Sequence, residues 1–291
     1  MVKLEMVDIV SYWKVTKPRL WFLLVYTGMA GYLIASKGLI DMKFFLTLLA
    51  LITGTAGANV VTSYIDRDID AIMIRTMKRP IPSGKIYPAW KALIYGLILV
   101  TIAIISSYLI NIYALAFMLF GLFDNIIIYS AIFKRRNPIN IIVGSFSGGA
   151  PAVIGYTAYS CRIDLLAIVL AALIVVWTPV HIWSLALYYR DDYKRAGVPM
   201  LPVVTSVETA IRCIASTSIL LVVFSYLIPA LHTPFNTIGY YIPVTVINII
   251  LLYIALRLII KPNLRWSWRL FKVTSPYLGI IFTVMMLLSF M

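Results

Sequence analysis

The sequence predicts an all-α integral membrane protein with about nine transmembrane helices. Hydrophobic residues make up 62% of the 291 residues and charged residues only 12%, whereas a soluble domain is about 45–50% apolar and about 25% charged. A soluble fold of this size cannot bury that excess, so the bilayer is the solvent that accepts it. A transmembrane β-barrel would alternate apolar and polar residues, and runs such as Ile219–Ile228 do not alternate.

The apolar stretches have the length that a membrane crossing needs, which is roughly 20 residues for a helix. We expect spans at about 20–36, 43–65, 89–110, 112–132, 140–160, 164–187, 209–231, 237–260 and 273–291. No linker, low-complexity tract or composition shift marks a soluble domain. We therefore expect a single transmembrane domain over residues 1–291.

The basic residues are distributed unevenly among the loops. Only three of the 25 Lys and Arg residues, Lys37, Lys43 and Arg162, lie in one set of loops, and the others lie in the alternate connections. Cytoplasmic loops carry such an excess, so we expect a multi-pass protein of the cell membrane with its N-terminus in the cytoplasm and its C-terminus outside. The net charge of +14 then reflects orientation and contact with membrane lipid rather than a nucleic-acid partner.

The first apolar stretch follows Lys14, Lys17 and Arg19, as the apolar region of a signal peptide follows basic residues. No A-x-A-like cleavage site follows it, and it is long enough to remain as an anchor. We expect this stretch to stay in the mature protein, with the three basic residues setting its orientation.

Five of the 11 acidic residues gather in two of the basic loops. Asp66, Asp68 and Asp70 follow the second span, and Asp191 and Asp192 follow the sixth. Asp66 and Asp70 share a helix face, which suits Mg²⁺ because this ion takes one or two protein carboxylates together with phosphate oxygens and water. The loops therefore predict a magnesium–diphosphate site facing the cytoplasm, with a solvated face of internal ion pairs as the alternative.

Segment 75–86 contains two prolines and a glycine, which predict a rigid turn. Such a turn can fold Arg75 and Arg79 back over the aspartates as a lid, where guanidinium groups suit bidentate phosphate contact. An ordinary loop whose charges set the orientation is the alternative.

Three features lie within the spans. His181 lies two to three turns inside the bilayer, a depth that indicates function: an imidazole can ligate haem iron, hold a propionate or relay a proton. A packing histidine is the alternative. Asp124 lies in the middle of the fourth span and should face the bundle interior. The small residues of segment 144–151 either permit close helix packing or leave room for a bulky ligand.

These residues belong to motifs that resemble the UbiA-type prenyltransferases, and among them the protoheme IX farnesyltransferase (haem O synthase) family. The motifs span nearly the whole chain: W-K-V-T-K-P-R-L (13–20), Y-I-D-R-D-I-D-A-I-M-I-R-T-M-K-R-P-I-P-S-G-K-I (64–86), K-R-R-N-P-I-N-I-I-V-G (134–144), G-G-A-P-A-V-I-G-Y (148–156), W-T-P-V-H-I-W-S-L-A (177–186) and D-D-Y-K-R-A-G-V-P-M-L-P-V (191–203). The first aspartate motif marks the superfamily, and the last two mark the haem branch.

The resemblance implies a helical bundle around a central cavity that opens toward the cytoplasm. It implies transfer of farnesyl from farnesyl diphosphate to the 2-vinyl group of haem B, with water adding to give haem O. It also implies Mg²⁺ or a similar divalent cation, and downstream partners such as haem A synthase or the assembly of a terminal oxidase.

The resemblance also implies roles for individual residues. Asp66 and Asp70 would hold metal and diphosphate and, with His181 as the haem contact, form the catalytic set. Asp191 or Asp192 would hold a second metal or orient the lid, with Asp192 as the expected metal ligand. The substrate-binding residues would be Asn59, Thr62, Asp68, Arg75, Arg79, Lys134, Arg135, Arg136, Asp191, Asp192 and Lys194. The chain departs from the superfamily at Thr62-Ser63, where N-D or N-N is usual, and Asn59 can take that polar role.

Two rival functions remain open. A UbiA-type enzyme acting on a quinone precursor or a glycerol-phosphate lipid would carry D-x-x-x-D in the second loop and no histidine motif. A polytopic transporter would use Asp124 and His181 as a proton relay, but it would not need paired aspartates beside arginines.

Overall fold

The computed structural model describes residues 8–291. The N-terminus, which we predicted to lie on the cytoplasmic side of the membrane, falls outside the described residues. Within them, nine helices are long and apolar enough to cross a membrane, and no strand is present. This confirms the all-helical, multi-pass membrane fold. The spans are α2 (Pro18–Ser36), α3 (Met42–Ile65), α5 (Trp90–Ile110), α6 with η1 (Ile112–Phe123 and Asp124–Phe133), α7 (Asn140–Ser160), α8 (Leu165–Tyr188), α11 (Val207–Leu231), α12 (Ile238–Ile260) and α13 (Leu264–Ser289).

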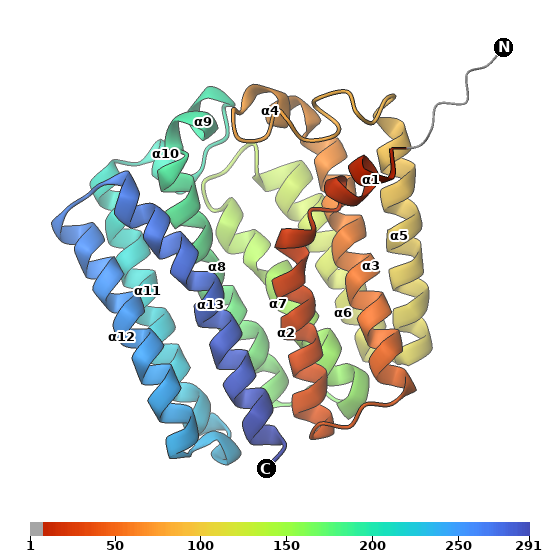
Figure 1. Cartoon of the computed structure of the whole chain (residues 1–291), viewed down its shortest axis with the longest axis vertical. Helices are drawn as coiled ribbons and strands as arrows, with labels where there is room; N and C mark the ends of the chain where they lie inside the picture. Colours follow the sequence, from red (N-terminus) through yellow and green to blue (C-terminus); the bar gives the residue numbers. More distant parts are fainter. Residues whose placement is uncertain (1–7) are drawn as a thin grey trace.

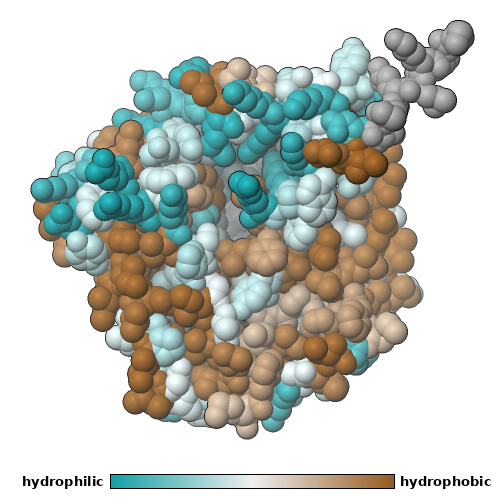
Figure 2. Space-filling model, in the orientation of Figure 1, coloured by the Kyte–Doolittle hydropathy of each residue, from teal (hydrophilic) through white to brown (hydrophobic). Residues whose placement is uncertain are grey.

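The short helices gather mainly at one end of the bundle, which we call the loop end. They are α1 (Ile9–Val15), α4 (Arg67–Ile72), α9 (Arg190–Arg195) and α10 (Leu201–Val204); the 3-10 turn η2 (Thr233–Phe235) joins α11 to α12. Figure 1 shows the long helices side by side with α4, α9 and α10 across their upper ends and the C-terminus at the opposite end. Figure 2 shows hydrophilic residues gathered over the loop end and hydrophobic residues over the sides.

The predicted span boundaries agree with the structure to within two residues, except at the start of the ninth span. We expected that helix from residue 273, but α13 begins at Leu264, where Asn263 Oδ1 accepts the N–H of Trp266 (3.0 Å). The prediction was wrong because it took the basic residues as a loop. They lie instead on the exposed face of a helical turn whose other face buries Leu270.

The fourth span changes its winding halfway along. The α-helix α6 ends at Phe123, and the π-helical η1 continues from Asp124 to Phe133. It closes where the N–H of Lys134 donates to the carbonyl of Tyr129, i to i−5, over 2.8 Å. Wide turns of this kind are rare and are frequent at functional sites. Here the turn carries the chain directly into Lys134, whose side chain reaches the carboxylate of Asp66.

Small residues bring α2 and α7 into close backbone contact. A Cβ atom added at Gly155 would lie 1.7 Å from the carbonyl oxygen of Gly28, and one added at Gly31 would lie 2.4 Å from that of Ala152. Within segment 144–151, a Cβ atom added at Gly149 would lie 3.0 Å from the carbonyl oxygen of Ala171 on α8, which confirms that these small residues permit close helix packing. Gly144 and Gly148 of the same segment line the central cavity, so the segment also leaves open space.

Candidate functional site

Asp66 lies at the junction of α3 and α4, where the chain leaves the long helix. It is 3% exposed, and one of its oxygens, Oδ2, is paired with the ammonium group of Lys134. Its other oxygen, Oδ1, is buried and has no hydrogen-bond partner. A buried acceptor without a partner is unfavourable, so Asp66 keeps one oxygen available for a ligand.

Asp70 lies one turn further along, and its backbone N–H donates to the carbonyl of Asp66 (2.8 Å). Arg79 Nη1 donates to both carboxylate oxygens of Asp70, over 3.0 and 2.8 Å. The Thr76 hydroxyl donates to the carbonyl of Asp70 (2.9 Å) and holds the intervening turn. The prediction that segment 75–86 folds Arg79 back onto the aspartates is therefore confirmed.

Asp68 points away from these two carboxylates. Its side chain is 62% exposed and pairs with Arg135, whose Nη1 and Nη2 donate over 2.7 and 2.6 Å. These hydrogen bonds lower the pKa of Asp68 to about 2. Asp68 and Arg135 thus neutralise each other on the outer surface, apart from Asp66 and Asp70.

Asp192 joins the second loop to the first. It is 8% exposed and accepts the backbone N–H groups of Ile74 (3.2 Å) and Arg75 (3.0 Å), with Arg195 Nη1 at 3.6 Å. Both oxygens are engaged by the protein. Of the two predicted roles, these contacts support orienting the lid, and holding a second metal stays a prediction.

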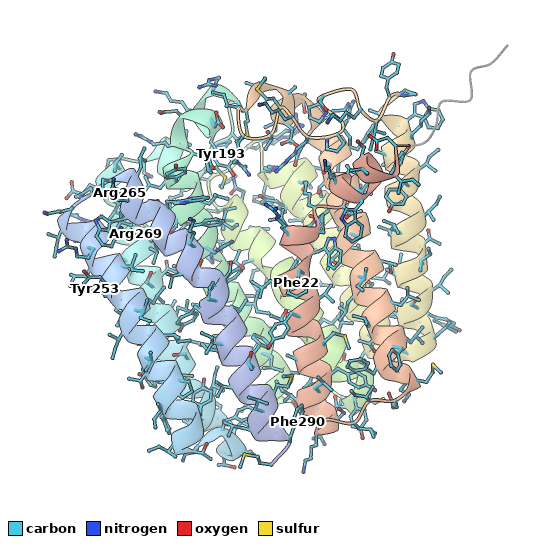
Figure 3. The ribbon with its side chains drawn as sticks, in the orientation of Figure 1. Phe22, Tyr193, Tyr253, Arg265, Arg269 and Phe290 are labelled. Atoms are coloured by element: carbon cyan, nitrogen blue, oxygen red, sulfur yellow. The ribbon has the colours of Figure 1, made fainter. Side chains whose placement is uncertain are left out.

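Arg75 is fixed in place by aromatic residues of the second loop. Its Nη2 donates to the Tyr193 hydroxyl (3.3 Å), and its guanidinium lies 5.2 Å from the ring centre of Tyr189. Its Nε is buried without a partner. Figure 3 shows Tyr193 extending from α9 at the loop end. The Nε–H group of Arg75 is therefore available to donate a hydrogen bond to a bound anion.

Lys17 is a member of this cluster that the sequence reasoning missed. It adopts a left-handed backbone conformation (φ 58°) at the turn between α1 and α2. Burial and the charge of Arg79 lower the pKa of Lys17 to about 7, while the carboxylates of Asp70 and Asp66 act in the opposite direction. The motif at 13–20 contained this lysine, but the charge pattern assigned it to membrane orientation.

The other predicted residues lie at different depths. Asn59 lines the central cavity. Thr62 is buried, and its hydroxyl donates to the Asn59 carbonyl (3.2 Å) within its own helix. The structure leaves three predicted substrate-binding residues exposed at the loop end: Arg136, Asp191 and Lys194.

A cavity of about 760 Å³ lies among α2, α3, α6 with η1, α7, α8 and α13, and ligand sites are commonly about 300–1,000 Å³. Its wall is mostly apolar, as at Leu51 and Ile154. Exposed residues of α2 and α13, including Phe22 and Pro276, also line it, so it opens at the surface between those helices. Figure 2 shows that face hollowed below the loop end, and Figure 3 places Phe22 there on α2.

His181 lines this cavity between two aromatic rings. Its ring centre is 4.5 Å from that of Trp177 and 4.4 Å from that of Phe271. Its Nδ1 lies 2.6 Å from the Thr274 hydroxyl oxygen, and that hydroxyl donates to the Phe271 carbonyl (2.7 Å). The hydroxyl oxygen is therefore left to accept, so Nδ1 carries the proton and Nε2 keeps its lone pair.

The arrangement is thus a charged rim of carboxylates and cations above an apolar cavity that holds one histidine. A comparison with family models identifies the family of the chain. The model described as the UbiA prenyltransferase family matches residues 24–276. The chain belongs to the UbiA prenyltransferase family.

Curated relatives that share one name within the UbiA family are similar to nearly the whole chain. A protein of Thermoplasma volcanium named protoheme IX farnesyltransferase is 43% identical over 96% of this chain and 98% of its own length. A protein of the same name from Thermoplasma acidophilum is 41% identical over 96% and 98%. Another from Desulforudis audaxviator is 39% identical over 95% of this chain and 87% of its own length.

Solved UbiA-type structures share the fold. A structure described as digeranylgeranylglyceryl phosphate synthase has a TM-score of 0.80 at 22% identity and covers 98% of this chain and 99% of its own. A UbiA homologue from Archaeoglobus fulgidus bound to GPP and Mg²⁺ has a TM-score of 0.63 at 15% identity, covering 94% and 99%. At these identities the likeness concerns the fold alone.

The donor set of this UbiA-type chain fits a divalent cation that shares its coordination with a substrate. Asp66 offers a buried oxygen without a partner, and Asp70 lies one turn away. Within residues 8–291, no cluster of three potential His, Cys, Asp or Glu ligands occurs. Phosphate oxygens and water would complete the shell, which is the usual arrangement for Mg²⁺.

Proposed function

We propose that this chain transfers the farnesyl group of farnesyl diphosphate to the 2-vinyl group of haem B and so forms haem O. One observation carries the proposal. Asp66 has an oxygen without a partner and Arg75 has an Nε without a partner, and these groups lie at the rim of an apolar cavity that contains His181. The names of the curated relatives support this substrate pair.

The diphosphate end of the substrate belongs at the rim. Arg75 keeps a buried Nε without a partner, and Lys17 lies among the charges of the site. Charge-assisted hydrogen bonds from such groups are about twice as strong as neutral ones, and they gain strength as charge develops on the leaving group. A divalent cation, Mg²⁺ or a similar ion, would be held by Asp66 and Asp70 and would neutralise charge on the leaving diphosphate.

The farnesyl chain fits the apolar part of the cavity. Departure of the diphosphate leaves an allylic cation, which the faces of Tyr129, Trp177 and Phe271 along the wall can stabilise. The surrounding aliphatic side chains exclude bulk water, so the cation survives until the vinyl group attacks it.

Haem B would enter through the opening between α2 and α13, because that is where the cavity meets the apolar side of the molecule. The free Nε2 lone pair of His181 suits a ligand of haem iron. Thr274 holds the other ring nitrogen and thereby orients the imidazole.

The rivals receive less support. The relatives' names do not point to a quinone or lipid acceptor. A proton relay between Asp124 and His181 gains no support from the contacts, because Asp124 bonds to Ser147 of α7 and His181 bonds to Thr274 of α13.

We further propose that the loop end faces the cytoplasm. Transfer of product to haem A synthase or to oxidase assembly stays a prediction.

In the decisive experiment, the purified protein is incubated in detergent and Mg²⁺ with two substrates, haem B and labelled farnesyl diphosphate. Label should move to haem. Asp66→Asn should lower the rate by about a hundredfold or more, because it removes a ligand charge from the diphosphate site. Asp68→Asn is the matched control: its carboxylate pairs with Arg135 outside the site, so the rate should remain near that of the wild type.

Two outcomes would count against the proposal. Wild-type protein that transfers label to another acceptor but not to haem would favour the first rival. Equal rates for Asp66→Asn and wild type would exclude Asp66 from the catalytic machinery.

A further inference from the structure

Asp124 is a buried carboxylate inside a membrane span that the proposed mechanism does not yet use. It is 6% exposed and begins the π-helical turn η1. Its Oδ2 accepts the backbone N–H of Ser147 on α7 over 2.9 Å. An ionisable residue at this depth is expensive, and a tie between two helices could be made by an uncharged side chain.

The immediate surroundings of Asp124 belong to the cavity wall. Asn125, the next residue, lines the cavity, and so does Ser147. The Ser147 hydroxyl donates to the Gly144 carbonyl (2.7 Å), so its oxygen is left with lone pairs that can accept. Asp124 is thus bonded to the backbone of a cavity residue that carries a hydroxyl group, in a cavity whose wall is mostly apolar.

Asp124 and His181 also lie at similar depths. Nine residues separate Asp124 from the end of its span at Phe133, and seven separate His181 from Tyr188. At about 1.5 Å per residue of α-helix, His181 lies roughly 10 Å below the loop end, and Asp124 lies at a similar depth because the π-helical η1 rises less per residue than an α-helix. The Asp124–Ser147 pair is therefore level with the group that we assign to the haem.

The proposed reaction has a need that matches this pair. Haem O carries a hydroxyl group that comes from water, yet the cavity excludes bulk water. One water molecule must therefore be held beside the reacting vinyl group, and it must lose a proton as it adds. A hydroxyl oxygen backed by a carboxylate meets both needs, since a positioned carboxylate is a general base.

We propose that Ser147 and Asp124 form a water-positioning pair, with Asn125 beside it, and that Asp124 accepts through Ser147 the proton that the water releases. The inference rests on the proposed function. Ser147 would contact the water directly, whereas Asp124 is a positioning residue that acts through Ser147.

The step balances as follows. The bond between C1 of the farnesyl group and the diphosphate oxygen breaks, and the electron pair leaves with diphosphate. The terminal vinyl carbon of haem B bonds to C1, which leaves positive charge on the vinyl carbon next to the porphyrin. Water oxygen bonds to that carbon and its proton passes to Ser147, whose hydroxyl turns from the Gly144 carbonyl and passes its own proton to Asp124. Haem B, farnesyl diphosphate and water thus become haem O, diphosphate and one proton.

Without the positioned water, the same cation would lose a proton from carbon and give an alkene lighter by one water. The full-length protein in detergent is therefore given haem B and farnesyl diphosphate, and the extracted haems are separated and weighed by mass spectrometry. Ser147→Ala and Asp124→Asn should each lower the ratio of hydroxylated to dehydrated product by about tenfold. Total farnesyl transfer should fall less.

The variants separate the chemical role from a structural one. Ser147→Ala keeps the backbone N–H that Asp124 accepts, so the tie between η1 and α7 survives. Asp164→Asn is the matched control, because that carboxylate also accepts a backbone N–H (Ala167, 3.1 Å) but caps α8 at the opposite end of the bundle. It should keep the wild-type ratio.

Unchanged product ratios in both Ser147→Ala and Asp124→Asn, with farnesyl transfer intact, would overturn the inference and leave the proposed function standing. Wild-type protein that farnesylates no haem would overturn both.

Discussion

At the scale of single residues, the rim depends on charges that neutralise one another across long stretches of sequence. Burial alone would lower the pKa of Lys134, but the carboxylate of Asp66 outweighs that effect and the pKa is raised. Lys134 therefore stays protonated and pairs with the carboxylate of Asp66 in a buried position. Removing either partner leaves an uncompensated buried charge, at a cost of about 3–5 kcal/mol.

Lys17 offers a prediction at this scale. Its amino group lies among four charged residues of the site, and within residues 8–291 it forms no ion pair of its own. Lys17→Ala should raise the KM for farnesyl diphosphate by about tenfold to a hundredfold, since a hydrogen bond to a charged group contributes about 1.5–3 kcal/mol. Steady-state kinetics over a range of diphosphate substrate measures the change.

Lys14→Ala is the control for Lys17, because Lys14 lies three residues away and is exposed. Lys17→Arg should recover part of the loss, since it restores the charge. A KM for Lys17→Ala equal to that of Lys14→Ala would remove Lys17 from the diphosphate site and return it to a role in membrane orientation.

The contrast between Asp70 and Lys17 shows how far sequence reasoning reaches at this scale. Asp66 and Asp70 are neighbours on one helical turn, so their spacing alone predicts a shared face, and the exposure of Asp68 agrees with it. Lys17 precedes an apolar run, and basic residues in that position usually set orientation. Lys17 has a positive φ and lies among the charges of the site, and no local pattern predicts either feature.

At the scale of elements, the site depends on α9 holding the turn that follows α4. Asp192 performs this task with two backbone hydrogen bonds. Asp192→Ala should therefore lower kcat/KM by about tenfold to a hundredfold by releasing Arg75. If orienting the lid is the only role of Asp192, the apparent affinity for Mg²⁺ should stay within about twofold of the wild-type value.

A titration of activity with Mg²⁺ checks this prediction, and Asp191→Ala is its control because Asp191 is exposed beside it. A much higher Mg²⁺ requirement in Asp192→Ala alone would restore the metal role that the sequence suggested. Sequence alone left both roles open, since the partners of Asp192 lie 117 and 118 residues away.

Helix packing supports a second prediction at the element scale. Gly155→Ala would push a Cβ atom into the backbone of α2 at Gly28, whereas Gly279→Ala on α13 meets nothing within 4 Å. Gly155→Ala should lower the thermal unfolding midpoint by several degrees, since overpacking costs about 1–3 kcal/mol. Gly279→Ala should be neutral or slightly stabilising, because alanine favours helix by about 1 kcal/mol over glycine.

Thermal unfolding in one detergent, followed by tryptophan fluorescence, compares the two glycine variants directly. Equal midpoints would mean that α2 and α7 can separate without loss.

The sequence prediction of the elements contained one error. Hydropathy identified the spans, but it could not tell a basic loop from the basic face of α13. The Asn263 cap and the burial of Leu270 in the structure reveal that face.

At the scale of the whole molecule, the bundle separates the two ends of the proposed reaction. Charges that suit diphosphate lie at the loop end, while the cavity opens sideways between α2 and α13 toward the apolar surface. A water-soluble group and a membrane-dissolved acceptor can thus reach one reacting centre by different routes. Composition predicted the membrane, and charge asymmetry predicted a single working end. The lateral opening depends on how the first and last spans pack, which no local sequence pattern contains.

The orientation of the molecule in the membrane can be tested with the chain's own cysteines. Cys161 is exposed and ends α7 opposite the loop end, whereas Cys213 lies partly buried on α11. The excess of basic residues at the loop end predicts that this end faces the cytoplasm. A membrane-impermeant maleimide should therefore label Cys161 in intact spheroplasts. Lys194→Cys, placed at the loop end in a variant with Cys161→Ser and Cys213→Ser, should react only after the membrane is broken. Labelling of Lys194→Cys in intact spheroplasts would reverse the orientation and place the diphosphate site outside the cell.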